Sequence, residues 1–170
     1  MKDFHIQYAS SPLDLTMGLV AGKVKHALMI EPGAALAILK AGQKGMKLER
    51  VVDIQRELGK TKGQEPRFAN AGVVALPKLA NHPEVIKAFA DAYDSSVKWA
   101  KSNPMKAAEI AAKQVAGVNA PAFNEALNHT IFESVSGKQS RQELEKMFRW
   151  FMALNPKSVG GKLPDAGFYY

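Results

Sequence analysis

The hydrophobic period of this chain changes at Pro77, and this change constrains the fold more than any other feature of the sequence. Before Pro77, short apolar runs alternate with amphipathic stretches, which is the pattern of strands and helices laid down in turn. After it, apolar residues recur every three or four positions, as on one face of an α-helix. The sequence therefore predicts an α/β first part and a helix-rich second part.

The first part contains four runs with strand character. These runs cover residues 4–9, 24–30, 49–54 and 71–76. Residues 27–30 are apolar without interruption, which predicts burial on both faces, as in a parallel sheet. The run at 49–54 carries several charges and is expected to be an edge strand.

Two helices and a loop are expected between these runs. Ser11 and Pro12 are a typical helix start, so a helix is expected over 12–20, and a second one over 34–40. Residues 60–67 contain glycine and proline and are expected to form a loop.

In the second part, three Asn/Pro signals mark helix boundaries, at residues 81–83, 103–104 and 155–156. The helix between the first two signals has one apolar stripe, made of Ile86, Phe89, Ala90, Tyr93, Val97 and Ala100. Further helices are expected over 105–115, 121–129 and 139–154. The irregular tail ends in three aromatic residues, which predicts that it docks onto the body of the protein.

Composition excludes several chemistries. The chain has no cysteine, so a thiol nucleophile, an iron–sulfur cluster and a cysteine-type zinc site are excluded. The net charge of +7 favours anionic ligands, acidic surfaces or nucleic acid as partners. No apolar stretch approaches the roughly 18 residues of a membrane span, and the beginning of the chain has no signal-peptide pattern.

The common catalytic and cofactor motifs are absent. Gly59-Lys60-Thr61 resembles the end of a phosphate-binding loop, but Ile54 stands where the first glycine of that motif is required. The four histidines lack the spacing of metal ligands, and no serine lies in a Gly-x-Ser-x-Gly elbow. Glu49 and Asp53 are expected to be solvated. The sequence thus predicts neither a metal nor a cofactor, and no catalysis.

The basic residues do not indicate nucleic-acid binding. Lysines are spread along the chain in small groups, and no basic stripe interleaved with aromatic residues is present. We therefore interpret the positive charge as a solvated surface, with no nucleic-acid partner.

The order of several motifs resembles a family of solute-binding proteins. The segment 19–32, which contains Gly22 and ends in Glu31-Pro32, is followed by Asn81-His82-Pro83, Asn103-Pro104 and 155–164. This layout is similar to the substrate-binding proteins of ABC transporters of the nitrate/sulfonate/taurine and thiamine-precursor type. The resemblance covers nearly the whole chain, although the family usually has an aspartate where Lys25 stands.

The resemblance implies a type II periplasmic-binding-protein fold, with two α/β lobes that close on a ligand. Compared with that pattern, the chain corresponds to the C-terminal part only. Residues 1–70 would be the C-terminal portion of lobe two, and residues 71–170 the returning portion of lobe one. Lobe-two strands without their partners would be adhesive edges, which favours dimerisation or strand exchange.

The candidate ligand-binding residues are Ser10, Ser11, Glu31 and Asn70. The first three stand at expected helix starts, where free N–H groups suit anions. The structural alternative is that the serines are helix N-caps and Glu31 a capping carboxylate. Asn70 is a candidate because it matches the hinge position of the family.

The expected function is capture of a small, sulfonate- or nitrate-like anion for an ABC importer, with the permease subunits as partners and a periplasmic or extracytoplasmic location. Two alternatives share the fold. One is the effector-binding domain of cytoplasmic LysR-type regulators. The other is the thiamine-pyrimidine synthases, enzymes that consume their own histidine, for which His26 is the candidate.

Overall fold

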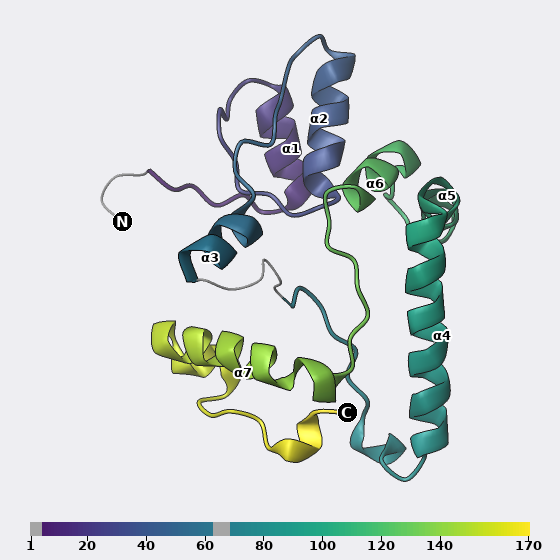
Figure 1. The fold of residues 1–170 in the computed structure, drawn as a ribbon. Helices are drawn as coiled ribbons and strands as arrows, with labels where there is room; N and C mark the ends of the chain where they lie inside the picture. The colour runs from purple at the N-terminus through teal and green to yellow at the C-terminus, as the bar shows by residue number, and fades with distance from the viewer. Residues whose placement is uncertain (1–4, 63–68) are drawn as a thin grey trace. The chain divides into compact units, whose positions relative to one another are not determined.

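The computed structural model describes residues 5–62 and 69–170, which form helices joined by irregular segments (Figure 1). The chain divides into two compact units, each made of two stretches: Met1–Val51 with Lys98–Phe132, and Val52–Val97 with Glu133–Tyr170. This division does not coincide with the boundary expected at residue 70. The assignment of the chain to two lobes stays a prediction.

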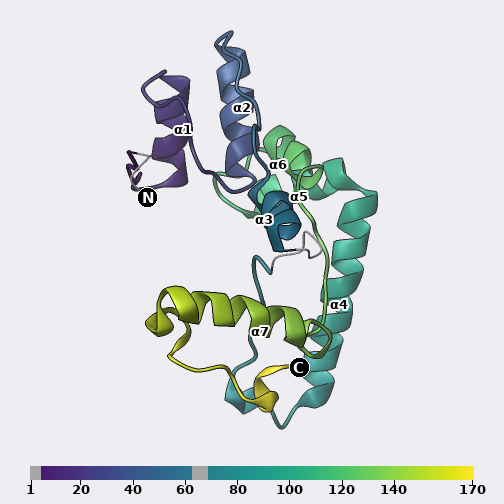
Figure 2. The same cartoon turned by 60° about the vertical axis from the view of Figure 1, so that its left-hand side comes forward.

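Among its described residues, the first unit contains four complete helices: α1 (Pro12–Val20), α2 (Gly33–Gln43), α5 (Pro104–Gln114) and α6 (Ala120–Leu127). Helix α2 packs against both α1 and α6, and α6 packs against α5, as Figure 1 and Figure 2 show. Ala35, Ala122 and Ala126 form the centre of the α2–α6 contact, with Leu36 and Leu39 packed against it. Small side chains allow the two helices to approach closely.

Local sequence explains where helices in this unit begin and end. Asn119 caps α6, because its side chain accepts a hydrogen bond from the Ala122 N–H at 3.0 Å. At the end of α2, Gly45 has a φ of 71°, which suits glycine, and the next residue donates from its N–H to the Ala41 carbonyl at 2.9 Å.

The second unit contains α3 (Ile54–Lys62), η1 (Pro77–Leu79), most of α4 (Pro83–Ser102), α7 (Gly137–Leu154), η2 (Pro156–Val159) and η3 (Ala166–Phe168). The last residues of α4 belong to the first unit. Ser136 caps α7 by accepting a hydrogen bond from the Gln139 N–H at 3.3 Å. No helix in the described part of the chain has both the length and the apolar composition needed to cross a membrane.

The expectation of an α/β fold is wrong. Residues 5–62 and 69–170 contain no β-strand, and the structure is helical. The runs expected as strands at 24–30 and 71–76 form neither a helix nor a strand. The run at 4–9 is likewise irregular from residue 5 onward, and Phe4 lies outside the described residues.

The physical reason is that a strand is stabilised by hydrogen bonds to a neighbouring strand, whereas a helix satisfies its own backbone. Residues 27–30 are not buried on both faces: Leu28 is 74% and Ile30 69% exposed. Apolar composition alone therefore predicted burial that no neighbouring element among the described residues provides.

The edge strand expected at 49–54 is also wrong, because a helix begins within it. The Asp53 carboxylate accepts a hydrogen bond from the Arg56 N–H at 3.0 Å, and the Asp53 carbonyl accepts one from Glu57 at 2.9 Å. These bonds start α3, which includes residues 60–62 of the expected loop. Residues 63–67 of that loop lie outside the described residues.

The predicted helices are confirmed with small shifts of their ends, and so is the docked tail. Tyr169 is only 4% exposed, and the Arg141 guanidinium of α7 lies 5.0 Å from the centre of its ring. Phe168 packs edge-on against Phe148 of α7, with 6.4 Å between ring centres. The carbonyl of Tyr170 accepts a hydrogen bond from the Lys138 N–H at 3.1 Å, at the beginning of α7.

Candidate functional site

The first turns of α1 and α2 adjoin each other in the first unit. A Cβ atom placed on Gly33, the first residue of α2, would lie 4.0 Å from the Cβ of Pro12, the first residue of α1. The two helices therefore begin side by side (Figure 1). The candidate residues Ser10, Ser11 and Glu31 lie at these two helix starts. Helix N-termini carry partial positive charge, which favours anionic groups.

Ser11 is an N-cap, as its structural alternative predicted. Its Oγ accepts a hydrogen bond from the Asp14 N–H at 3.1 Å and donates one to the Asp14 carboxylate at 2.9 Å. Both hydrogen-bonding functions of the hydroxyl are therefore used within α1. Ser10, one residue earlier, is exposed.

Glu31 carries out the capping role at α2. One carboxylate oxygen accepts a hydrogen bond from the Ala35 N–H at 3.1 Å, and the other accepts one from the Arg50 Nε at 2.8 Å. The side chains of Glu31 and Arg50 are 17% and 26% exposed. The chain thus supplies its own anion to the first turn of α2 and pairs it with a guanidinium.

Arg50 connects Glu31 to a second carboxylate on α6. The Nη1 atom of Arg50 lies 3.5 Å from Glu125 Oε1, which lies 3.0 Å from His129 Nε2. Four ionisable groups from three parts of the first unit are therefore linked. Sequence reasoning missed Arg50, Glu125 and His129 at this place. The i,i+4 spacing of Glu125 and His129 is a local signal for that pair, but none links Arg50 to Glu125, which is 75 positions away.

Asn70, the fourth predicted residue, falls in the second unit, on an exposed irregular stretch. The structure thus brings Ser11 and Glu31 to adjoining helix starts and leaves Asn70 in a different unit from them. His26, which the synthase alternative requires in a cleft, is exposed.

The groups at the starts of α1 and α2 can interact with charged ligands of either sign. Arg50 and the helix starts favour anionic groups, whereas Glu31 and Glu125 favour cationic ones. Among the residues that the structure describes, no group of three or more His, Cys, Asp or Glu side chains is placed to hold a metal ion.

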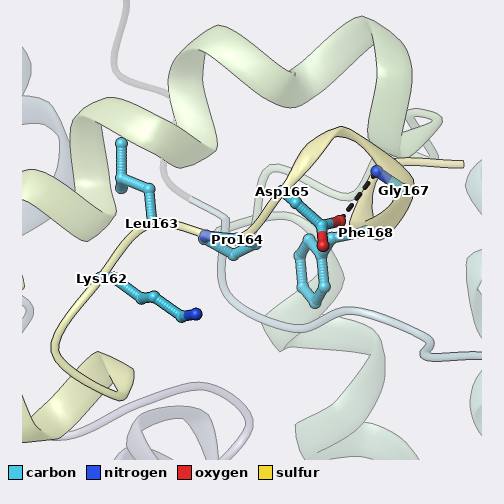
Figure 3. A pocket seen from close by; sticks show the side chains of 6 residues that line it. All are labelled: Lys162, Leu163, Pro164, Asp165, Gly167 and Phe168. Carbon is cyan, nitrogen blue, oxygen red and sulfur yellow. Dashed lines mark hydrogen bonds between the residues drawn. The ribbon is translucent and has the colours of Figure 1, made fainter.

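A hollow of about 440 Å³ lies along the tail in the second unit (Figure 3). Its lining comes from a single short stretch: Lys162, Leu163, Pro164, Asp165, Gly167 and Phe168. The Asp165 carboxylate accepts a hydrogen bond from the Gly167 N–H at 3.0 Å. None of the predicted site residues lines the hollow, and the Asp165 carboxylate at its wall already caps η3.

A charged cluster on α7 lies beside the docked tail. Glu145 accepts hydrogen bonds from Arg141 at 2.8 Å and from Arg149 at 3.3 Å. The bond from Arg141 lowers the pKa of Glu145. Burial raises the pKa of Tyr169, and the nearby Glu145 charge raises it further. Because all these groups serve the contact between α7 and the tail, we interpret the cluster as structural.

The comparison with solved structures links the chain to a transporter. A crystal structure of an ABC transporter from Parabacteroides distasonis matches with a TM-score of 0.76 and 26% sequence identity. The match covers 98% of this chain. The fold is ABC-transporter-like. The chain spans 56% of the length of that protein. No protein-family model and no curated protein matches the chain.

Proposed function

We propose that this chain is part of the solute-binding component of an ABC importer. The observation that carries the proposal is the match of 98% of the chain to an ABC transporter structure. The solute-binding role, in place of the membrane or ATPase components, is supported by the order of motifs around Gly22, Glu31-Pro32 and Asn155-Pro156. In this role the protein acts outside the cytoplasm, performs no catalysis and delivers its solute to permease subunits.

The proposed solute is a small anion of the sulfonate or nitrate type. Support comes from the net charge of +7 and from the adjoining first turns of α1 and α2. Ser10 would contact the solute at the start of α1, whereas Ser11 and Glu31, which cap α1 and α2, would hold these turns in place. Asn70 remains the proposed hinge residue. Binding would shift the protein toward a closed state by the difference in affinity between the open and closed states.

Thermal unfolding of the complete protein with a panel of solutes tests this proposal. A sulfonate or nitrate at 100 times its Kd stabilises the folded state by about 2.7 kcal/mol, and the melting temperature is expected to rise accordingly. Ser10→Asp should weaken the affinity for the anion at least tenfold by charge repulsion. Ser10→Asn, which has nearly the shape of the aspartate without its charge, should not weaken the affinity. Stabilisation by neutral or cationic solutes alone would overturn the anionic assignment.

A further inference from the structure

The hollow along the tail is lined by two opposite charges with apolar groups between them. Lys162 and Asp165 both line it, and Leu163 and Pro164 separate them along the chain. The Phe168 ring also lines it (Figure 3). Lys162 and Asp165 are exposed, whereas Leu163 and Pro164 are half-buried. The hollow thus offers a cation, an apolar wall and an anion to one ligand.

The hydrogen bonds within the hollow leave both charges able to bind a ligand. Asp165 Oδ1 accepts the hydrogen bond from the Gly167 N–H at 3.0 Å, so Oδ2 can accept one from an ammonium group of a ligand. Lys162 forms no hydrogen bond with the other residues drawn in Figure 3. Its ammonium has three donors, which can bind a carboxylate.

Contacts outside the hollow fix its walls. Phe168 packs edge-on against Phe148, with ring centres 6.4 Å apart, and against Tyr169, with ring centres 5.2 Å apart. At the other end, η2 packs against α7. Gly160 and Gly161, with φ of 71° and 79°, then turn the chain into the stretch that lines the hollow. Walls that are ordered before binding reduce the entropy that is lost when a ligand binds.

The size and the charges of the hollow favour a particular kind of molecule. Its volume of about 440 Å³ lies within the range of about 300–1,000 Å³ that is typical of small-molecule sites. A simple anion would leave the apolar wall uncovered and would be repelled by Asp165. A free amino acid carries its two charges on adjacent groups, whereas a dipeptide separates them by a peptide unit, as Leu163 and Pro164 separate the two charges of the hollow.

We propose that this hollow is a binding site for a zwitterionic dipeptide with apolar side chains. The ligand carboxylate pairs with the Lys162 ammonium, and the ligand ammonium pairs with the Asp165 carboxylate. The ligand side chains pack against Leu163, Pro164 and Phe168. The site lies within the second unit, so it is distinct from the starts of α1 and α2 in the first unit.

Calorimetric titration of the protein with leucyl-leucine tests the proposal. We expect saturable, one-to-one binding. Two derivatives each lack one charge, because N-acetyl-leucyl-leucine has no ammonium and leucyl-leucinamide has no carboxylate. Each derivative should bind about three to five times more weakly than leucyl-leucine, since one ion pair at an exposed site is lost.

Substitutions identify the protein charge that recognises each end of the dipeptide. Asp165→Asn keeps an oxygen that can cap η3 but removes the charge, so this variant should bind leucyl-leucine and its N-acetyl derivative equally. Lys162→Gln should bind leucyl-leucine and its amide equally. Lys157→Gln, on η2 and outside the lining of the hollow, removes the same charge and is the matched control. It should bind all three probes as the native chain does.

Three results would overturn the proposal: no saturable binding of leucyl-leucine, equal binding of the three probes by the native chain, or equal effects of Lys162→Gln and Lys157→Gln. The comparison of probes on the native chain does not depend on how the substitutions affect folding. Binding of nitrate or of an alkanesulfonate at α1 and α2 should be the same in the Lys162 and Asp165 variants. Failure here is therefore distinguishable from failure of anion binding.

Discussion

The Nε of Arg50 lies 2.8 Å from Glu31 Oε1, and this pair connects the first turn of α2 to a residue nineteen positions later in the chain. Glu31 uses its other oxygen to cap α2, so the pair fixes the orientation of that cap. Both side chains are largely shielded from solvent, with 26% and 17% exposed. The interaction free energy between Arg50 and Glu31 should therefore be larger than that of a fully exposed ion pair.

A double-mutant cycle with Arg50→Gln and Glu31→Gln measures this coupling. We expect an interaction free energy of about 1 kcal/mol, obtained from urea unfolding. The exposed pair Lys87 and Asp91 serves as control and should give about 0.3–0.5 kcal/mol. Equal coupling in the two pairs would show that partial burial of Arg50 and Glu31 does not strengthen their interaction.

Substitution of Gly137 should disturb the docked tail. A Cβ at this position would lie 2.9 Å from the backbone nitrogen and oxygen of Tyr170. Gly137→Ala is therefore expected to lower the free energy of unfolding by about 1–3 kcal/mol and to make the tail accessible to carboxypeptidase. In contrast, a Cβ on Gly42 of α2 meets nothing within 4 Å, so Gly42→Ala should raise stability by about 0.5–1 kcal/mol.

Removal of the Tyr169 hydroxyl should stabilise the protein. The Oη atom is buried and has no hydrogen-bond partner in the described structure, and such a group costs about 1–3 kcal/mol. Tyr169→Phe is expected to raise the free energy of unfolding by about 1 kcal/mol. A loss of stability in Tyr169→Phe would instead reveal a hydrogen bond to this hydroxyl.

Because the Tyr169 hydroxyl is buried, we also expect the tail to detach at alkaline pH, when this phenol ionises. Burial raises the pKa of Tyr169 in the folded state, so folding favours the neutral phenol. Below about pH 10, the ordinary pKa of tyrosine, the phenol is neutral in both the folded and the unfolded chain, so the free energy of unfolding does not change with pH through this group. Above that pH the unfolded chain releases the proton and the folded chain keeps it, so the free energy of unfolding falls until the pH has passed the raised pKa of the folded state. Tyrosinate absorbance, recorded together with carboxypeptidase sensitivity of the tail, should show both changes in the native chain and a weakened transition in Tyr169→Phe.

Local signals predicted the helices other than α3 well. Ser11 with Pro12 starts α1, and Asn103 with Pro104 starts α5, because a helix start depends on residues within one turn of it. The aromatic end of the chain also predicted the docked tail, which Tyr169 anchors.

Features that depend on distant partners could not be predicted. The apolar run at 24–30 has strand composition, but a strand also needs a neighbouring strand, and composition does not identify one. In the candidate site, the capping alternatives for Ser11 and Glu31 were predicted from their positions at helix starts. The link from Arg50 to Glu125 was not, since it arises from the packing of α6 against α2.

Isothermal titration calorimetry of the complete protein is the most direct test of the central claim, which is capture of a small anion for an ABC importer. We predict one-to-one, saturable binding of an alkanesulfonate or of nitrate, with no heat of binding for neutral and cationic solutes. Tight binding of a neutral or cationic solute without any response to these anions would contradict the account.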